Sequence, residues 1–322
     1  MGTMMEISKK KHERPARKLI GRTAVSILGL LALEQTGILS FEGGSAVAGA
    51  NQTQSSNLLP GVIFAESNGV VFGEPNAAGA YDGNPTDPVV GITAVNVAGQ
   101  TAKGYDLVAS RGGLANVGGA PYEGSAAGIN LAAPIVGIAS TPDGKGYWEV
   151  GADGGVFSFG DASFYGSMGG KHLNAPVVGI ASTADGKGYW LAAKDGGVFS
   201  FGDARFYGSM AGKQLNQPVD GIISTPDGKG YWLAAKDGGV FSFGDAGFYG
   251  SAPGFYEQLG ANLPSDYVGI VPMNTANSTG YGVYDIYGDM IYFSSSASPR
   301  YIPTPDIAQS GVVGAAVISP NP

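Results

Sequence analysis

Short hydrophobic runs, separated by turns rich in glycine and aspartate, recur along the chain and predict β-strands. The clearest example consists of Val177–Thr183, Tyr189–Lys194, Val198–Phe201 and Arg205–Ser209. Runs of this length that contain β-branched and aromatic residues are typical of strands. The Asp-Gly pair between the second and third runs indicates a hairpin turn. The pattern therefore predicts an antiparallel unit of four strands.

This unit repeats with a period of 42 residues. Gly186–Ala204 and Gly228–Ala246 are identical, and Gly144–Ala162 differs from them at a few positions. A four-stranded repeat of this length is typical of a β-propeller blade. In its second strand, Tyr189 and Trp190 point to opposite faces, so both faces are apolar, as packing between two neighbouring blades requires.

Weaker copies lie on either side, and the two ends of the array complement each other. Residues 61–83 match strands two to four, whereas 311–320 match strand one, so we expect 311–320 to pair with 61–73. That pairing removes two exposed sheet edges. We therefore predict an all-β fold: a six-bladed β-propeller of four-stranded antiparallel blades, with the first blade closed by the C-terminal strand. The alternatives are an open β-solenoid, similar to choline-binding modules, and a propeller of five or seven blades. The predicted units are about 60–83 plus 311–320, 88–125, 134–167, 176–209, 218–251 and 267–302.

The first 50 residues have the features of an export segment. Seven Lys and Arg precede residue 23, the apolar run Thr23–Leu33 follows, and Ala46-Val47-Ala48 offers a cleavage site. The run has the length of a signal-peptide core and is too short to span a bilayer. We expect cleavage near residues 48–50, a linker at 51–59 and the propeller over 60–322. We therefore expect a secreted or cell-surface protein with no membrane span in the mature chain. The alternative is that this segment stays uncleaved as an anchor.

Composition narrows the chemistry. The chain has no Cys, which excludes disulfides and thiolate metal sites. From Asn51 onward there are 11 basic and 22 acidic residues, a net charge of −11 that disfavours nucleic acid and anionic membranes. His172 is the one histidine outside the first 50 residues, so a His-based triad or metal site would depend on it alone. We expect no cofactor, with Ca²⁺ as the alternative.

Aspartates recur at three positions of the repeat, each in a turn. Turn aspartates accept hydrogen bonds from nearby backbone N–H groups, so we expect a structural role rather than a ring of Ca²⁺ ligands. Four other carboxylates break the pattern, and a unique acid–base site would include some of them if the protein were a hydrolase or lyase. The repeated sets are Asp143, Asp185 and Asp227, then Asp153, Asp195 and Asp237, then Asp161, Asp203 and Asp245; the exceptions are Asp106, Glu123, Glu149 and Asp220.

Aromatic residues at equivalent positions give the best functional hypothesis. Several shallow aromatic sites on one rigid scaffold would bind a sugar polymer through avidity. The alternative is that these rings form the core; the Phe-Tyr pairs on the outer strands are expected to be the more exposed. The candidate ligand-binding residues are Trp148, Trp190, Trp232, Tyr165, Tyr207 and Tyr249.

The repeated string Gly-Lys-Gly-Tyr-Trp, followed by Asp-Gly-Gly-Val-Phe-Ser-Phe-Gly-Asp-Ala, resembles a repeat of secreted actinobacterial proteins over residues 134–251. The resemblance implies an extracellular setting and a propeller-like fold, and it brings no catalytic residues with it. We therefore predict a secreted, non-catalytic binding module for cell-surface or cell-wall glycan. An extracellular protein-interaction scaffold and a carboxylate-dependent hydrolase or lyase are the alternatives.

Overall fold

The structure, a computed structural model, describes residues 61–73, 87–96, 104–263, 266–274, 278–303 and 310–318. The chain divides into two units, 1–52 and 53–322, and all described residues belong to the second. The predicted export segment, cleavage site and linker lie outside the described residues. None of the helices within these ranges has the length and apolar character needed to cross a membrane.

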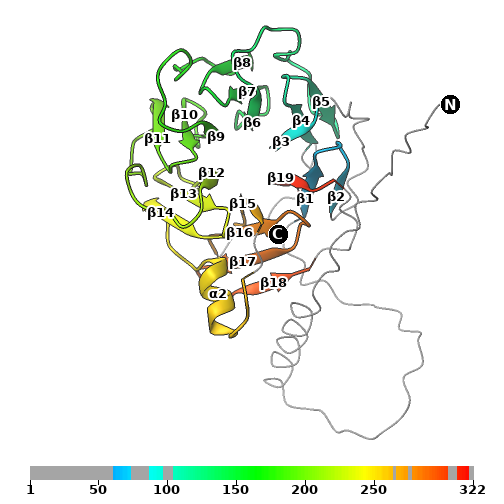
Figure 1. Cartoon of the computed structure of the whole chain (residues 1–322). Helices are drawn as coiled ribbons and strands as arrows, with labels where there is room; N and C mark the ends of the chain where they lie inside the picture. Colours follow the sequence, from blue (N-terminus) through cyan, green and yellow to red (C-terminus); the bar gives the residue numbers. More distant parts are fainter. Residues whose placement is uncertain are drawn as a thin grey trace, which may run out of the picture. The chain divides into compact units, whose positions relative to one another are not determined.

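The described residues form six antiparallel sheets, here named I to VI in chain order (Figure 1). The first three sheets are I, with β19 (Val312–Val317), β1 (Val62–Glu66) and β2 (Val71–Gly73); II, with β3 (Val89–Val95), β4 (Gly104–Ala109) and β5 (Leu114–Val117); and III, with β6 (Ile135–Ser140), β7 (Gly146–Gly151) and β8 (Val156–Gly160). The other three are IV, with β9 (Val177–Ser182), β10 (Gly188–Ala193) and β11 (Val198–Gly202); V, with β12 (Val219–Ser224), β13 (Gly230–Ala235) and β14 (Val240–Gly244); and VI, with β15 (Tyr267–Pro272), β16 (Gly280–Asp285), β17 (Met290–Ser294) and β18 (Arg300–Ile302).

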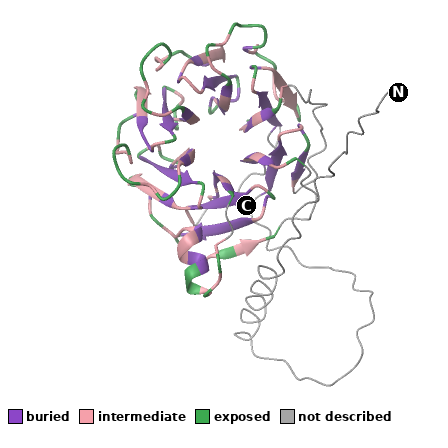
Figure 2. Cartoon of the chain, viewed as in Figure 1, coloured by how far each residue is buried: buried purple, intermediate pink, exposed green. Residues whose placement is uncertain are grey.

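The middle strand of every sheet is buried on both faces, as the sequence predicts (Figure 2). The core consists of clusters between neighbouring sheets, and one of them joins Trp148 and Val150 of sheet III to Tyr189 and Leu191 of sheet IV. The tryptophan and tyrosine rings there have centroids 5.5 Å apart. Burial of these large rings is the main apolar contribution to packing between sheets.

The two ends of the described chain meet in sheet I. Strand β19 pairs antiparallel with β1, with Val62 opposite Val317 and Phe64 opposite Ala315. The predicted pairing of 311–320 with 61–73 is thus confirmed at these strands. The buried carboxylate of Glu66 strengthens the junction, because its Oε2 accepts hydrogen bonds from the backbone N–H and the hydroxyl of Ser310 at 2.8 and 2.9 Å.

One edge strand of each sheet lies next to a common centre and is called the first strand of that sheet (Figure 1). The first strands are β19, β3, β6, β9, β12 and β15. Contacts run from β3 to β6, β9, β12, β15, β19 and back to β3. A glycine sits at the same place on each of these strands, and a Cβ added to Gly91 would lie 3.4 Å from the Cα of Gly137. The recurring Gly-Ile in the sequence is therefore explained by close approach of backbones at the centre. The remaining glycines of this set are Gly179, Gly221, Gly269 and Gly314.

Four strands are present in sheet VI, whereas the other five sheets have three each among the described residues. The expected fourth strand at Arg205–Ser209 is not a strand, because side chains of its surroundings satisfy its backbone. The indole Nε1 of Trp190 donates to the carbonyl of Arg205 at 2.8 Å, and the hydroxyl of Tyr231 donates to the carbonyl of Gly208. This segment therefore fills the space between sheets IV and V instead of extending sheet IV.

A short helix, α2 (Ala252–Gln258), follows sheet V and was not expected from the sequence pattern. Ser251 caps its first turn, with its hydroxyl accepting from the N–H of Gly254. Pro253 lies at the start of the helix, where its missing N–H has no partner to lose. Phe255 and Tyr256 bury the inner side of the helix.

Candidate functional site

Four exposed aromatic side chains occupy equivalent positions after the outer strands of sheets II to V. Tyr122, Phe164, Phe206 and Phe248 follow one another at the repeat spacing of 42 residues. Their exposed fractions are 62%, 59%, 55% and 61%, high values for rings of this size. The expectation that the Phe-Tyr pairs are more exposed than the tryptophans is confirmed for the phenylalanines. Tyr122 was missed, although its spacing from Phe164 was visible in the sequence.

The segments that carry these rings are held by buried side chains on both sides. Behind Phe164, the indole Nε1 of Trp148 donates to the carbonyl of Ser163 at 2.9 Å. From the next sheet, the hydroxyl of Tyr189 donates to the carbonyl of Gly166 at 2.6 Å and accepts from the backbone N–H of Tyr165 at 3.2 Å. Because the backbone on either side of Phe164 is anchored, the exposed ring starts from a fixed position.

The predicted tryptophan sites are in the core. The three tryptophans have an exposed fraction of 0%, and each indole N–H donates a hydrogen bond to a backbone carbonyl; they are Trp148, Trp190 and Trp232. A sugar has no access to these ring faces in this arrangement, so the tryptophans correspond to the alternative interpretation as core residues.

The predicted tyrosine sites are half-buried and link one sheet to the next. The Tyr165 hydroxyl donates to the carbonyl of Gly186 at 3.1 Å, and Tyr207 repeats this bond to Gly228 at 3.3 Å. The ring of Tyr165 also lies 5.8 Å from that of Tyr189. Tyr249 is likewise half-buried and contacts Trp232 and Tyr281. Each of these tyrosines directly follows an exposed phenylalanine in the sequence and connects that segment to the next sheet.

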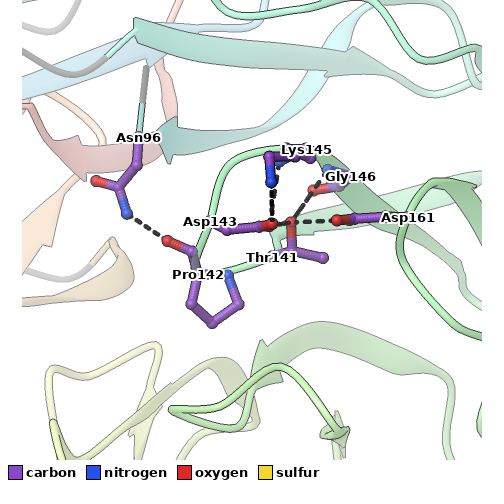
Figure 3. Close-up of polar contacts among 7 residues, drawn as sticks. All are labelled: Asn96, Thr141, Pro142, Asp143, Lys145, Gly146 and Asp161. Carbon is purple, nitrogen blue, oxygen red and sulfur yellow. Dashed lines mark hydrogen bonds and ion pairs between the residues drawn. The ribbon is translucent and has the colours of Figure 1, made fainter. Parts of the chain in front are cut away.

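The turns of sheets IV and V that receive the tyrosine hydroxyls contain aspartates of the first repeated set, and sheet III has the same turn. In sheet III, the Thr141 hydroxyl donates to Asp143 at 2.8 Å, and Lys145 pairs with the same carboxylate at 3.3 Å (Figure 3). The Thr141 bond is the largest of the effects that lower the pKa of Asp143. Asp161 lies on the other side of Thr141, where burial and the neighbouring Asp143 raise its pKa.

The same turn in sheets IV and V has a closer ion pair. Lys187 lies 3.0 Å from Asp185, and Lys229 lies 2.9 Å from Asp227. These bonds lower the pKa of both aspartates to about 2, so the carboxylates are ionised at any ordinary pH. Each lysine is about 70% exposed at its side chain, so the pairs present polar groups to solvent rather than stabilising the fold strongly.

The second set of aspartates closes the hairpins. The N–H groups of Gly155, Gly197 and Gly239 donate to Asp153, Asp195 and Asp237 at 2.9–3.0 Å. Within the described ranges, no three His, Asp or Glu side chains come together as a metal-binding group. These contacts favour the structural role over a ring of Ca²⁺ ligands.

Asp106 of sheet II occupies the place that tryptophan holds in sheets III to V. In sheet III, Trp148 pairs across the strands with Ser158, whereas in sheet II Asp106 pairs with Asn116. The Asn116 amide donates to Asp106 at 2.7 Å and to the carbonyl of Pro121 at 3.0 Å. Pro121 is equivalent to the residue that accepts the Trp148 indole bond. The Asp106–Asn116 pair thus replaces the hydrogen bond of the missing indole.

Glu149 of sheet III occupies a leucine position of the repeat. Its equivalents are Leu191 and Leu233, and all three are fully buried. Neither carboxylate oxygen of Glu149 has a hydrogen bond of normal geometry, although the backbone of Ala126 faces it. Burial raises the pKa of Glu149 to about 8, against a smaller lowering by Ala126.

Asp106 and Glu149 lie in the same interface between sheets II and III. Val108 and Tyr147 meet there, and alternate residues of a strand share a face, so Asp106 lies on the Val108 side and Glu149 on the Tyr147 side. Both carboxylates raise the pKa of Tyr147, after the larger effect of burial. Burial likewise raises the pKa of Asp106 to about 7, while the Asn116 bond lowers it. The sequence marked these residues as exceptions but gave no sign that they share an interface.

The other two exceptions, Glu123 and Asp220, do not join this buried pair, although the backbone N–H of Glu123 donates to the Tyr147 hydroxyl at 3.1 Å. Glu123 is exposed, at the position equivalent to Tyr165, and His172 is exposed in a loop. Asp220 lines the central cavity of about 340 Å³ at a place where the other sheets have valine. Its carboxylate oxygens are nevertheless buried and without a hydrogen-bond partner, and burial raises its pKa to about 7.

The central cavity therefore offers little for carboxylate chemistry. Its described lining consists mainly of Val, Gly, Ile, Ala and Ser from the first strands, with Asp220 as its one carboxylate residue. Asp106 and Glu149 are fully buried between sheets and do not belong to this lining. A glycosidase-type mechanism needs two carboxyl groups flanking a substrate, and this arrangement does not bring two of them to the cavity.

No protein-family model matches this chain, and no curated protein matches it.

Proposed function

We propose that the six sheets are the blades of a closed six-bladed β-propeller. The cyclic contacts of the first strands support this proposal, because an open solenoid would leave β3 and β19 far apart. Pairing of β19 with β1 supports it too, since the joining of first and last blades removes two sheet edges. Three-stranded sheets are compatible with a propeller here, because the segments between them fill the space that fourth strands would occupy.

The propeller serves as a secreted, non-catalytic module that binds cell-surface or cell-wall glycan. The observation that carries this proposal is the row of exposed rings at Tyr122, Phe164, Phe206 and Phe248. Sugar-binding sites combine an apolar ring surface with a few polar groups that fix orientation. The Asp-Gly-Lys turns of sheets IV and V carry such groups, and each accepts the hydroxyl of a half-buried tyrosine that follows an exposed phenylalanine in the sequence.

Repetition raises the overall affinity that these shallow sites can reach for a polymer. A single exposed ring binds a sugar weakly, because little of the ligand is enclosed. A polymer that reaches two or more rings on one rigid body binds the later ones as an intramolecular step, so the affinities combine. The anchored backbone on both sides of each ring keeps the spacing fixed and reduces the ordering entropy.

An extracellular location rests on two features of the sequence. The basic segment and apolar run before residue 34 resemble a signal peptide, and the 42-residue repeat resembles that of secreted actinobacterial proteins. The absence of Cys is compatible with export, because a core of this size needs no disulfides.

Retention of the purified protein on a glycan array and on insoluble cell-wall polymer tests the proposal. We expect binding that falls by about tenfold or more when Phe164, Phe206 and Phe248 are changed together to Ala, because avidity is lost. Ile129→Ala is the matched control, since Ile129 is also an exposed apolar residue (47%) but lies outside the row. Absence of retention on every glycan and wall polymer would refute the glycan assignment and leave the protein-interaction scaffold.

A further inference from the structure

The segments that return along the outer strands are held differently in sheet II and in the sheets that follow it. Each such segment is here called a strap: 120–130 in sheet II, 162–172 in sheet III and 204–214 in sheet IV, at the repeat spacing of 42 residues. In strap 162–172, the Met168 N–H donates to the hairpin carbonyl of Gly154 at 2.8 Å, and the Trp148 indole donates to the carbonyl of Ser163 at 2.9 Å. Strap 204–214 repeats both bonds. Neither bond involves a group that titrates near neutral pH.

Strap 120–130 replaces both bonds with contacts that involve carboxyl groups. The Asn116 amide takes the place of the indole, because it donates to the carbonyl of Pro121 at 3.0 Å and to Asp106 at 2.7 Å. Ala126 occupies the methionine position, but its N–H makes no bond to a hairpin carbonyl of the described residues and instead faces Glu149. The position of this strap therefore depends on the protonation of Asp106 and Glu149.

Glu149 lies against the inner side of this strap. It is fully buried where the repeat has leucine, and neither of its carboxylate oxygens has a hydrogen bond of normal geometry. Ala126 is the one buried residue of strap 120–130, and residues 127–130 are exposed. Displacement of the strap would therefore let water reach the carboxyl group. A charge on Glu149 in the closed arrangement has no partner and is costly, whereas in the open arrangement water solvates it.

The groups that face Glu149 and Asp106 supply no compensating positive charge. Tyr147 lies on the same face of β7 as Glu149, and its hydroxyl accepts from the strap N–H of Glu123 at 3.1 Å. Tyr122 and Glu123 are the titratable residues of the strap itself. Strands β3, β5, β6 and β8 around this interface contain no charged residue. None of the groups that shift the pKa of Glu149, Asp106 or Tyr147 is a Lys, Arg or His.

We propose that strap 120–130 is a pH-sensitive cover, which opens transiently and does so more often as the pH rises, because Glu149 and Asp106 ionise when water reaches them. In the closed state, burial raises the pKa of Glu149 from 4.5 to about 8 and that of Asp106 from 3.8 to about 7. In the open state both groups lose their protons at lower pH, so the closed state is favoured most below the two ordinary pKa values. The opening constant then rises by about tenfold per pH unit for each group until the closed-state pKa is reached. This device does not depend on what the exposed rings bind.

Amide hydrogen exchange of the full chain at pH 5, 6 and 7 tests this proposal. Each rate is compared with that of an unstructured peptide at the same pH, so that the resulting protection factor reports opening alone. We expect the protection factors of Glu123 and Ala126 to fall by about tenfold or more per pH unit. The matched controls are Tyr165 and Met168, at the same positions of strap 162–172, where the protection factors should stay constant.

Two variants assign the effect to the carboxyl groups. Glu149→Gln keeps a polar side chain of the same size that does not ionise, so it should reduce the fall in protection at Ala126 by about tenfold or more between pH 5 and pH 7. Glu149→Gln combined with Asp106→Asn should abolish the fall, since the new amide can still accept from Asn116 but has no titrating proton. Thermal melting at pH 5 verifies that each variant folds. The comparison of the two straps in the unmodified chain stands even if a variant does not fold.

Three results would overturn the proposal. Constant protection at Glu123 and Ala126 over this pH range would show that the strap does not respond to ionisation. An equal fall at Tyr165, at Met168 and at the amides of β10 would assign the pH dependence to the whole fold. A fall that persists in the double variant would assign it to other groups. Failure of glycan retention would leave this proposal intact, because the exchange measurement contains no ligand.

Discussion

Glu149 is the residue whose replacement tests the packing between sheets most sharply. The repeat itself supplies the substitution, because Leu191 and Leu233 fill the equivalent place fully buried. Glu149→Leu therefore removes a buried carboxyl group and restores the apolar side chain that the neighbouring interfaces contain. We expect the variant to be more stable than the natural protein, and increasingly so as the pH rises.

The size of the effect follows from the pKa. Burial raises the pKa of Glu149 from 4.5 to about 8, and each pKa unit corresponds to about 1.4 kcal/mol. A raised pKa means that the unfolded chain loses its proton first, so folding stability is greatest below pH 4.5 and falls as the pH rises toward 8. Between pH 5 and pH 8 this loss amounts to about 3 kcal/mol. Burial of a leucine adds about 1.5–3 kcal/mol at any pH.

The assay is urea unfolding of the natural protein and the variants at pH 5, 6, 7 and 8. Glu149→Gln removes the charge but keeps a polar side chain, so it should flatten the pH dependence without the apolar gain. Glu123→Gln is the matched control, because it makes the same replacement at an exposed glutamate. An unchanged pH slope in Glu149→Leu, or a loss of stability at pH 8, would refute the reasoning.

Three further substitutions test the other polar contacts. Asn116→Ala removes the bonds to Asp106 and Pro121, so it should lower the free energy of unfolding by about 1–3 kcal/mol, measured by urea unfolding. It should also raise the pKa of Asp106 further, measured by NMR titration. Trp190→Phe keeps a ring in the core but leaves the carbonyl of Arg205 without its indole donor, so a similar loss of about 1–3 kcal/mol is expected by urea unfolding, and a neutral result would contradict this role. Ser310→Ala removes a hydroxyl bond to the buried Glu66, and faster hydrogen exchange in β19 than in β9 should follow, with equal rates as the contradicting outcome.

Local patterns predicted most of the strands. The hairpin aspartates and the doubly buried middle strand both follow from the repeat, because each depends on residues close together in the sequence. The pairing of β1 with β19 was also predictable, since the two ends of the array each lack what the other has.

The errors share a physical cause. Arg205–Ser209 has the composition of a strand, but its backbone bonds to Trp190 and Tyr231, which the strand pattern does not consider. The tryptophans were candidate ligand platforms because sequence alone does not reveal which face of a sheet meets another sheet. Likewise, Asp106 and Glu149 lie 43 residues apart in the sequence, and only the stacking of sheets II and III places both in one interface.

A designed disulfide gives the most direct test that the two ends of the chain complete one sheet. Val62 and Val317 are opposite each other in β1 and β19. The next pair along the ladder, Gly61 and Ile318, is hydrogen-bonded, because the Ile318 N–H donates to the Gly61 carbonyl. Since the two kinds of pair alternate, Val62 and Val317 form a non-hydrogen-bonded pair, in which the side chains lie closest. The natural chain has no Cys, so Val62→Cys with Val317→Cys can form one bond only. We predict an intramolecular disulfide in the monomer under mild oxidation, identified by mass spectrometry. Val62→Cys with Val313→Cys, at the far end of β19, should form none. Equal cross-linking of both pairs, or cross-links between molecules only, would contradict the pairing of β1 with β19 in this sheet.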